Sequence, residues 1–221
     1  MNIGIIVAMD KELSLLLPLI KNVTETSING FTFHDGTLEN HHVTVVRCGI
    51  GKVNAAIGTM TLLDGFHPSL VINTGVAGGT GATNILDIVV ADRIAYHDVW
   101  CGPETLLGQA AGCPPAFISE VEPHTLHGLN VKRGLIASGD VFVADEQTVN
   151  RILSLYPDAL AVDMESAAIA HVCHVKKVRF MCIRVISDTP GAADNISQYE
   201  NFWSDAPAQT FDVLRSILKR L

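Results

Sequence analysis

Short apolar runs rich in β-branched residues recur along the chain and alternate with stretches of helical character. The runs have the length of strands and lie at residues 3–8, 43–48, 70–74, 85–94, 131–137, 159–162 and 179–186. Several are continuously apolar, which is typical of strands covered on both faces. The stretches between them predict helices over residues 11–21, 52–65, 145–155, 165–174 and 208–221.

Strands that alternate with helices predict an α/β layered fold around a largely parallel sheet. The chain shows no internal repeat, low-complexity tract or linker, so we expect one domain over residues 1–221. Residues 98–115 contain Gly and Pro and follow neither period, and we expect an exposed excursion there. Because open α/β sheets bind ligands at the carboxyl ends of their strands, we expect the chemistry in the segments that follow each strand.

The composition of the 221 residues argues against several classes of function. Hydrophobic residues make up 48% and charged residues 17%, as in a compact globular protein. The net charge of −8 disfavours binding to nucleic acid and to anionic membranes. Residues 2–9 lack the features of a signal peptide, and no apolar run reaches the ~18 residues that span a membrane. The five cysteines form no CxxC pair, so we expect reduced thiols in a cytoplasmic protein.

Three segments in the first half of the chain join a strand to a helix or loop with acidic or small residues. Segment 9–12 (MDKE) places acids either where they stabilise a helix dipole or beside a cleft. Segment 48–52 (CGIGK) lacks the Walker A spacing, and its glycines fit a tight turn or a close approach to a ligand. Segment 73–79 (NTGVAGG) suits either a turn or the floor of a pocket.

Three further segments follow strands in the second half. In segment 138–143 (SGDVFV), Phe142 either stacks on a planar base or fills the core. In segment 162–166 (VDMES), two acids flank Met164 and either support a helix start or belong to a site. In segment 184–191 (RVISDTPG), Arg184 needs a carboxylate partner or a solvated cavity, and Asp188 lies where α/β enzymes carry reacting groups.

Two histidine-containing segments suggest other chemistry. The pair His171 and His174 lies on one predicted helix, but no third or fourth ligand occurs at a recognised zinc spacing. His97 and Asp98 suggest an acid–base pair, although ordinary hydrogen bonds in a loop are the simpler interpretation. We therefore expect neither a metal nor a cofactor.

Taken in order, these segments resemble the 5′-methylthioadenosine/S-adenosylhomocysteine nucleosidases, within the wider nucleoside phosphorylase superfamily. The resemblance covers nearly the whole chain and is carried by GIIVAMDKEL, CGIGKVNAA, INTGVAGG, DIVVADRIAYHD, RGLIASGDVFV, AVDMESAAIAHVC and RVISDTP. No single motif is decisive, but seven in sequence are specific. The resemblance implies a three-layer αβα sandwich around a mixed, largely parallel sheet, a homodimer, and hydrolysis of the N-glycosidic bond of adenine thionucleosides.

The resemblance also implies a role for each matching residue. Glu12 is the implied base that activates water, and Arg184 supports the water site. Glu165 is implied to hold the ribose hydroxyls, and Asp188 to protonate the purine as general acid. The remaining implied substrate-binding residues are Met9, Ile50, Val76, Ala77, Gly78, Phe142, Val143, Met164, Ser187 and, as an aromatic lid, Tyr199 or Phe202.

The chain departs from the family pattern at three places. Val76 stands where the family often has Ser, which removes one hydrogen bond to the attacking water. Asp163 stands where Glu is common, a shorter carboxylate of the same charge. Residues 98–115 also differ, in a region that reaches the partner's active site in the family, so the preference at the 5′ substituent stays open.

Three alternative functions remain. A purine nucleoside phosphorylase would use phosphate, but related phosphorylases place Arg and Ser where this chain has Asn73 and Val76, and Glu12 would repel phosphate. A non-catalytic nucleoside-binding protein would not need three carboxylates. The third alternative is a nucleosidase for another substrate, such as 5′-deoxyadenosine, aminodeoxyfutalosine or AMP. Of these substrates AMP is disfavoured, because no Arg-rich site for its phosphate is evident.

Overall fold

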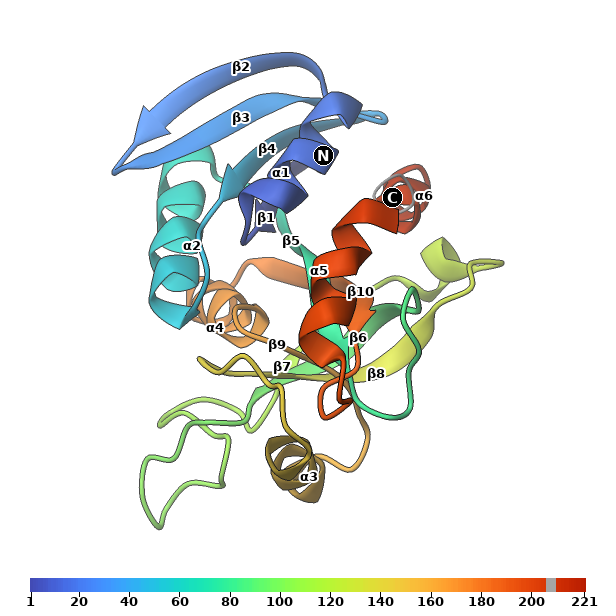
Figure 1. Cartoon of the computed structure of the whole chain (residues 1–221). Coiled ribbons are helices and arrows are strands. Elements are labelled where there is room, and N and C mark those ends of the chain that lie inside the picture. The colour runs from blue at the N-terminus through green and yellow to red at the C-terminus, as the bar shows by residue number, and fades with distance from the viewer. Residues whose placement is uncertain (206–209) are drawn as a thin grey trace.

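In the computed structural model, which describes residues 1–205 and 210–221, a ten-stranded mixed sheet forms the centre of the molecule (Figure 1). Its parallel core has the order β4-β1-β5-β10. Three further strands, β6, β8 and β9, connect β10 back to β5. Together with β5 and β10 they form a closed ring of five strands. The bounds are β1 (Asn2–Val7), β4 (His41–Arg47), β5 (Leu70–Gly79), β6 (Ile88–Tyr96), β7 (Phe117–Ile118), β8 (Lys132–Ser138), β9 (Ala159–Asp163) and β10 (Arg179–Asp188).

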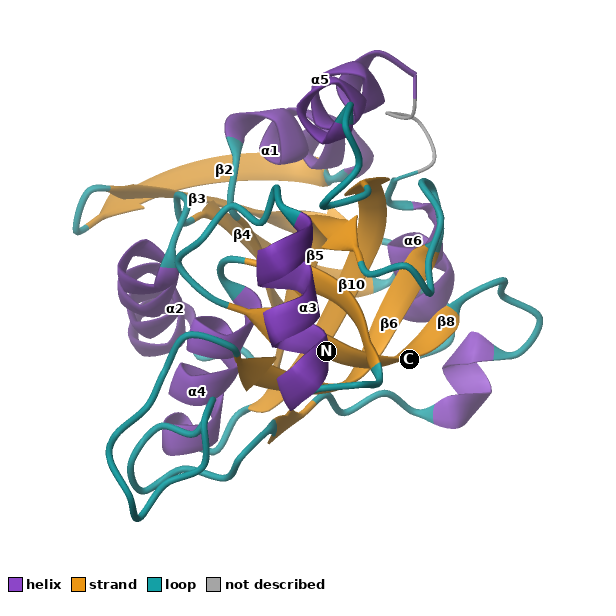
Figure 2. Cartoon of the chain, turned by 60° about the horizontal axis from the view of Figure 1, so that its bottom comes forward, coloured by secondary structure: helices purple, strands orange, loops and turns teal. Residues whose placement is uncertain are grey.

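Helices cover both faces of this sheet (Figures 1 and 2). Ile6 of β1 points into a core shared with α2 and α4, whereas its neighbour Ile5 points into a core shared with α1 and α6. This alternation follows from the two-residue period of a strand. The predicted αβα layering is therefore confirmed. The helices are α1 (Asp10–Leu16), α2 (Lys52–Phe66), α3 (Glu146–Leu155), α4 (Ser166–Lys176), α5 (Asn195–Asp205) and α6 (Asp212–Leu218).

The segment that follows α1 differs from the prediction. The predicted helix over residues 11–21 ends at Leu16, and a 3₁₀ turn, Leu17–Leu19, follows it. Pro18 offers no N–H group and closes the α-helix. The chain then forms the unpredicted antiparallel hairpin of β2 (Lys21–Ile28) and β3 (Phe31–Leu38). The pattern missed β2 because this edge strand is exposed almost throughout and carries no buried face.

Other boundaries also shift. β6 begins at Ile88 and not at residue 85, and α5 was not predicted. Within the predicted helix over 208–221, residues 208 and 209 lie outside the described residues, and α6 spans Asp212–Leu218. As predicted, residues 98–115 form neither helix nor strand. In the described part of the chain, no helix combines the length and the apolar character needed to cross a membrane.

Candidate active site

A cavity that is partly open to solvent lies at the carboxyl ends of β1, β5, β9 and β10. This is the edge at which α/β sheets place their ligands. All the sequence-predicted site residues line it except Arg184 and Phe202. The lining residues are Ala8, Met9, Glu12, Ile50, Val76, Ala77, Gly78, Val141, Phe142, Val143, Val162, Asp163, Met164, Glu165, Ser187, Asp188 and Tyr199.

Glu12 lines the cavity and is fixed there by three backbone N–H groups. Its Oε2 accepts hydrogen bonds from the N–H groups of Ala8 (2.8 Å) and Met9 (2.9 Å), and its Oε1 accepts one from Val76 (3.0 Å). The contact with Met9 is local, because a Glu in the first turn of a helix reaches back to the residue before it. Burial raises the pKa of Glu12, while Arg184 and the three N–H groups oppose that rise. The side chain is thus a buried, oriented carboxyl group.

Gly75 lets β5 approach Glu12 closely. A Cβ atom at this position would lie 2.1 Å from Glu12 Oε1 and 2.9 Å from Arg184 Nη1. The absence of a side chain at Gly75 therefore brings the Val76 N–H within reach of Glu12. Since that contact comes from the backbone, it does not depend on the side chain at position 76.

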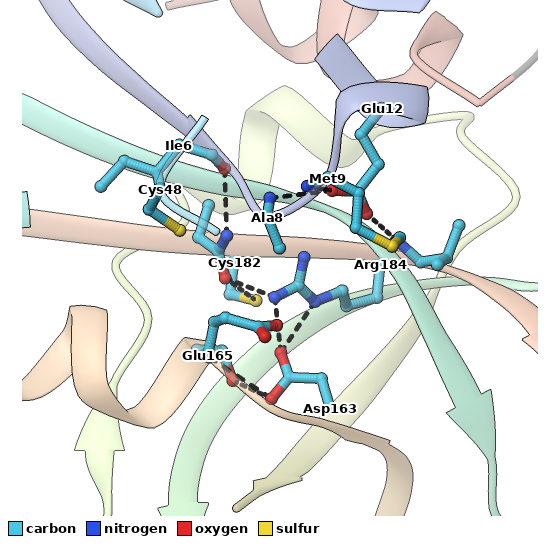
Figure 3. A network of polar contacts seen from close by, with 12 residues as sticks. Ile6, Ala8, Met9, Glu12, Cys48, Asp163, Glu165, Cys182 and Arg184 are labelled. Atoms are coloured by element: carbon cyan, nitrogen blue, oxygen red, sulfur yellow. Dashed lines mark hydrogen bonds and ion pairs between the residues drawn. The ribbon is translucent and has the colours of Figure 1, made fainter. Parts of the chain in front are cut away.

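Arg184 is fully buried and does not line the cavity. Figure 3 shows its guanidinium group close to Asp163 and Glu165. Its Nε and Nη2 donate to Asp163 Oδ2 at 2.9 and 2.5 Å, and Nη2 also donates to Asn73 Oδ1 at 2.6 Å. The carboxylate partner that the sequence demanded is thus Asp163. Burial alone would lower the pKa of Arg184, but Asp163 raises it above its ordinary value, so the side chain stays charged.

Asn73 is a member of this network that the sequence analysis did not assign. Its Nδ2 donates to the carbonyl oxygen of Ile6 at 3.0 Å, and its Oδ1 accepts from Arg184. Asn73 therefore joins β1 to β10 across β5. The sequence did carry a signal for Asn73, because an amide side chain in the middle of a continuously apolar strand must find hydrogen-bond partners.

Glu165 stands at the start of α4, on the cavity wall. Its Oε1 accepts from the N–H of Gly51 at 2.8 Å, and Gly51 precedes α2. Gly51 adopts φ +94°, a conformation that favours glycine, and this aims its N–H at the carboxylate. Burial, with the neighbouring Asp163, raises the pKa of Glu165 to about 7. Asp163 also supports the start of α4, because its Oδ1 accepts from the Ser166 hydroxyl at 2.9 Å.

Asp188 is the last residue of β10, lines the cavity and is 3% exposed. Its Oδ1 accepts from the Ser187 hydroxyl at 2.6 Å, and its Oδ2 accepts from Asn195 Nδ2. Burial raises the pKa of Asp188, and these two hydrogen bonds oppose the rise. Asn195 was not predicted, and no signal marked it, since it lies in a polar segment without periodicity.

Aromatic and thioether side chains form the apolar wall. Phe142 is 48% exposed and meets Tyr199 edge to face, with ring centroids 5.7 Å apart. The Tyr199 hydroxyl donates to Met9 Sδ at 3.1 Å. Of the two aromatic residues suggested as a lid, Tyr199 lines the cavity, whereas Phe202 is buried against Trp203 and does not.

The two histidine-containing segments lie away from this cavity. His171 Nε2 is 3.0 Å from Cys113 Sγ, and its Nδ1 is 3.2 Å from the Tyr96 hydroxyl. Asp98 accepts from Lys52 Nζ at 2.8 Å rather than from His97. In the described ranges, no group of three or more His, Cys, Asp or Glu side chains is arranged to hold a metal ion.

Comparisons with known proteins identify the family of this chain. The family model described as phosphorylase superfamily matches residues 2–219. The 5′-methylthioadenosine/S-adenosylhomocysteine nucleosidase of Anoxybacillus flavithermus is 39% identical over 234 residues, covering 100% of this chain and 99% of the relative. The chain belongs to this nucleosidase family, within the phosphorylase superfamily.

Solved structures of the nucleosidase family share the fold closely. The S-adenosylhomocysteine nucleosidase of Streptococcus pyogenes, in complex with 5-methylthiotubericidin, has a TM-score of 0.92 and 35% identity, covering 100% of this chain and 97% of that one. Futalosine hydrolase of Helicobacter pylori has a TM-score of 0.90 and 27% identity, covering 100% and 98%. The fold is thus shared by hydrolases with differently named substrates.

Proposed function

We propose that this chain hydrolyses the N-glycosidic bond of 5′-methylthioadenosine and S-adenosylhomocysteine, releasing adenine and the thioribose product. The observation that carries the proposal is the convergence of three buried carboxyl groups, Glu12, Glu165 and Asp188, on one cavity. They come from α1, the start of α4 and the end of β10. Membership of the nucleosidase family supports the same activity.

Departure of adenine needs a proton, because the adenine anion is a poor leaving group. Asp188 is the general acid that delivers this proton to N7. Its burial keeps the pKa of the carboxyl group raised, so that more of it is protonated near working pH. Ser187 lies beside it and contacts the same carboxyl group.

Positive charge develops on the ribose as the bond lengthens. Glu165 lines the cavity with one oxygen held by Gly51, and it binds the ribose hydroxyls and stabilises the oxocarbenium-like transition state. Met164, next to it in the chain, lines the sugar pocket. An acid on one side of the sugar and a base on the other is the arrangement that glycosidases use.

Water attacks the face of the sugar opposite adenine. Glu12 is the base that orients and deprotonates it, and the buried charge of Arg184 next to Glu12 supports the water site. The backbone N–H groups around Glu12 fix the direction of the carboxyl group before water arrives.

The rest of the cavity suits a nucleoside. Phe142 packs on the adenine ring, with the backbone of Val143 at the edge of the base, and Tyr199 closes the pocket as its lid. Met9 and Ile50 line the ribose and alkylthio side. The floor is formed by residues of the NTGVAGG segment, Val76, Ala77 and Gly78.

A phosphorylase is the alternative closest in chemistry. The contacts argue for water, because Glu12 would repel phosphate and because Arg184 is engaged by Asp163 and Asn73. The test is adenine release from 5′-methylthioadenosine, S-adenosylhomocysteine, 5′-deoxyadenosine, aminodeoxyfutalosine and AMP, with and without phosphate. Release of adenine from the two thionucleosides without phosphate is expected. Strict phosphate dependence with formation of a ribose 1-phosphate, or no release at all, would refute the proposal.

The enzyme is further proposed to be a homodimer. Val53, Ile57 and Met60 are exposed on one side of α2, and Val175 is exposed on the adjacent α4. An apolar stripe at helical spacing is typical of a surface that another protein covers. Light scattering should give twice the chain mass, and Val53→Glu with Ile57→Glu should give a monomer. A monomeric wild-type chain at micromolar concentration would contradict this proposal.

A cytoplasmic location is proposed on the state of the thiols. All five cysteines are free, and three of them, Cys48, Cys173 and Cys182, are buried. Unpaired thiols are the rule in reducing compartments. Cell fractionation tests this directly, and recovery of the chain in an oxidising compartment would refute it.

A further inference from the structure

The two oxygens of Asp188 receive hydrogen bonds of different kinds. Oδ1 faces the hydroxyl of Ser187 at 2.6 Å, and the same hydroxyl lies 3.3 Å from the carbonyl oxygen of Ala77. Oδ2 faces Nδ2 of Asn195, which is seven residues further along the chain and only 3% exposed. One carboxyl group is thus held between a hydroxyl and an amide.

These two partners differ in what they allow. A hydroxyl both donates and accepts, and the Ser187 hydrogen can turn from Asp188 to the carbonyl of Ala77. An amide N–H group only donates. Oδ2 can accept from Asn195 both as part of a carboxylate and as the C=O oxygen of the neutral acid, but it cannot carry a proton in the direction of that N–H. Along these two contacts, a proton on Oδ2 would oppose the Asn195 N–H group, whereas a proton on Oδ1 meets a hydroxyl that can turn away.

The orientation of the Asn195 amide follows from the same contact. Its Oδ1 is buried and has no hydrogen-bond partner among the described residues. Reversing the amide would put that oxygen against the carboxylate, a repulsive contact. Asp188 is thus the group that determines which way the amide faces. Since Asn195 does not line the cavity, it acts on the reaction through Asp188.

We propose that Asn195 is a positioning residue that keeps Oδ2 of Asp188 as a hydrogen-bond acceptor, so that the proton transferred to adenine resides on Oδ1. The inference rests on the proposed function, in which Asp188 is the general acid. Asn195 is also the first residue of α5, the helix that carries Tyr199, so one residue links the acid to the start of the lid helix.

Other titratable groups line the same cavity as Asp188. These are Glu12 of α1, Asp163 at the end of β9, Glu165 at the start of α4, and Tyr199 of α5. They are unchanged in a variant of Asn195. A difference in pH dependence between such a variant and the wild type therefore reports the contact between Asn195 and Asp188.

The experiment compares Asn195→Ala and Asn195→Asp with a matched control, Asn201→Ala, which changes an exposed asparagine of the same helix. The ratio kcat/KM for adenine release from 5′-methylthioadenosine is measured between pH 5 and pH 10. The general acid works when protonated, so kcat/KM falls as pH rises through its pKa. Removing a donor to the carboxylate raises that pKa, and the falling limb should move to higher pH by about one unit in Asn195→Ala.

Asn195→Asp should move the limb further, because a second carboxylate beside Asp188 disfavours its ionisation. This variant keeps the shape of the side chain, and an acidic residue suits the first turn of a helix, so it decides the question if the Ala variant fails to fold. In both Asn195 variants, kcat at low pH should also fall about tenfold, because the proton of Asp188 is no longer confined to Oδ1. Asn201→Ala should match the wild type.

The proposal is overturned if the folded Asn195 variants keep the falling limb of the wild type, even with reduced kcat. It is equally overturned if Asn201→Ala moves the limb as far. Failure of the proposed function looks different, since the wild-type chain would then release no adenine at any pH. An active wild type with unmoved limbs in both variants would leave the hydrolase proposal standing and remove only the role of Asn195.

Discussion

Two carboxyl groups that line the cavity, those of Glu12 and Asp188, are held in different ways. Glu12 accepts from the backbone N–H groups of Ala8, Met9 and Val76. Asp188 accepts from two side chains, those of Ser187 and Asn195. Both carboxyl groups are buried, and burial raises the pKa of each.

The difference matches the tasks proposed for the two groups. Backbone N–H groups are fixed by the sheet and helix that they belong to and can only donate, so they favour one orientation and the ionised form of Glu12. The buried Arg184 acts in the same direction. At Asp188 one of the two donors is a hydroxyl that can reverse its role, so this carboxyl group can gain and lose a proton. A base is best held rigidly, whereas an acid needs partners that tolerate both of its states.

The largest expected effect comes from removing either carboxyl group. Asp188→Asn and Glu12→Gln should each lower kcat by about 10²–10⁴-fold, the usual contribution of general acid–base catalysis. A nitrophenyl glycoside of 5-methylthioribose distinguishes the roles of Asp188 and Glu12, because its leaving group departs without a proton. Asp188→Asn should regain most activity on this substrate and Glu12→Gln should not. Equal recovery in both variants would end the distinction between acid and base.

Breaking the ion pair behind Glu12 should come next in size. Asp163→Asn leaves the buried Arg184 without its carboxylate, and the free energy of unfolding should fall by about 3–5 kcal/mol. Urea denaturation measures this. Asp158→Asn removes the partner of Arg93 in an exposed pair and should cost less than about 1 kcal/mol. Similar losses in the two variants would show that Asp163 is not needed to balance Arg184.

A side chain at Gly75 should disturb Glu12 and Arg184 rather than Asp188. Gly75→Ala places a Cβ atom against Glu12 Oε1 and Arg184 Nη1, and displacement of the base should lower kcat by about 10²-fold. Gly65→Ala in α2 is the control, because that position is exposed and helical. Steady-state kinetics on both variants, with circular dichroism to verify folding, provides the measurement. An unaffected kcat in Gly75→Ala would mean that Glu12 tolerates being moved.

The smallest of these expected effects is a change in stability with pH, and it comes from Glu165. Burial raises the pKa of Glu165 from its ordinary value of 4.5 to about 7. A carboxyl group with a raised pKa contributes stability that is fully present below pH 4.5 and is lost as pH rises through about 7. Glu165→Gln removes this loss. The Tm of the variant minus the Tm of the wild type should therefore increase by several degrees as pH rises from 4.5 to 8. The exposed Glu200→Gln should show no such trend, and a flat difference for Glu165→Gln would place its carboxylate in a solvated setting.

The sequence predicted the fold where burial leaves a pattern. The continuously apolar strands at residues 3–8, 70–74 and 179–186 were located well, because both of their faces are covered. It failed at β2, an exposed edge strand, and at α5, whose polar start carries no apolar period. Part of that failure was avoidable, since Asn29-Gly30 is a strong hairpin signal and both residues have positive φ.

The sequence by itself determined which chemical groups stand at the ends of strands. Glu12, Glu165 and Asp188 each follow or end an apolar run, and the topology of an α/β sheet brings such ends together. Only the tertiary structure decided which donors meet each of them. Val76 reaches Glu12 from 64 residues away, and Asn195 reaches Asp188 from an unpredicted helix. Hydrogen bonds form only when atoms come within about 3 Å, and that precision arises from packing, which periodicity along a chain does not record.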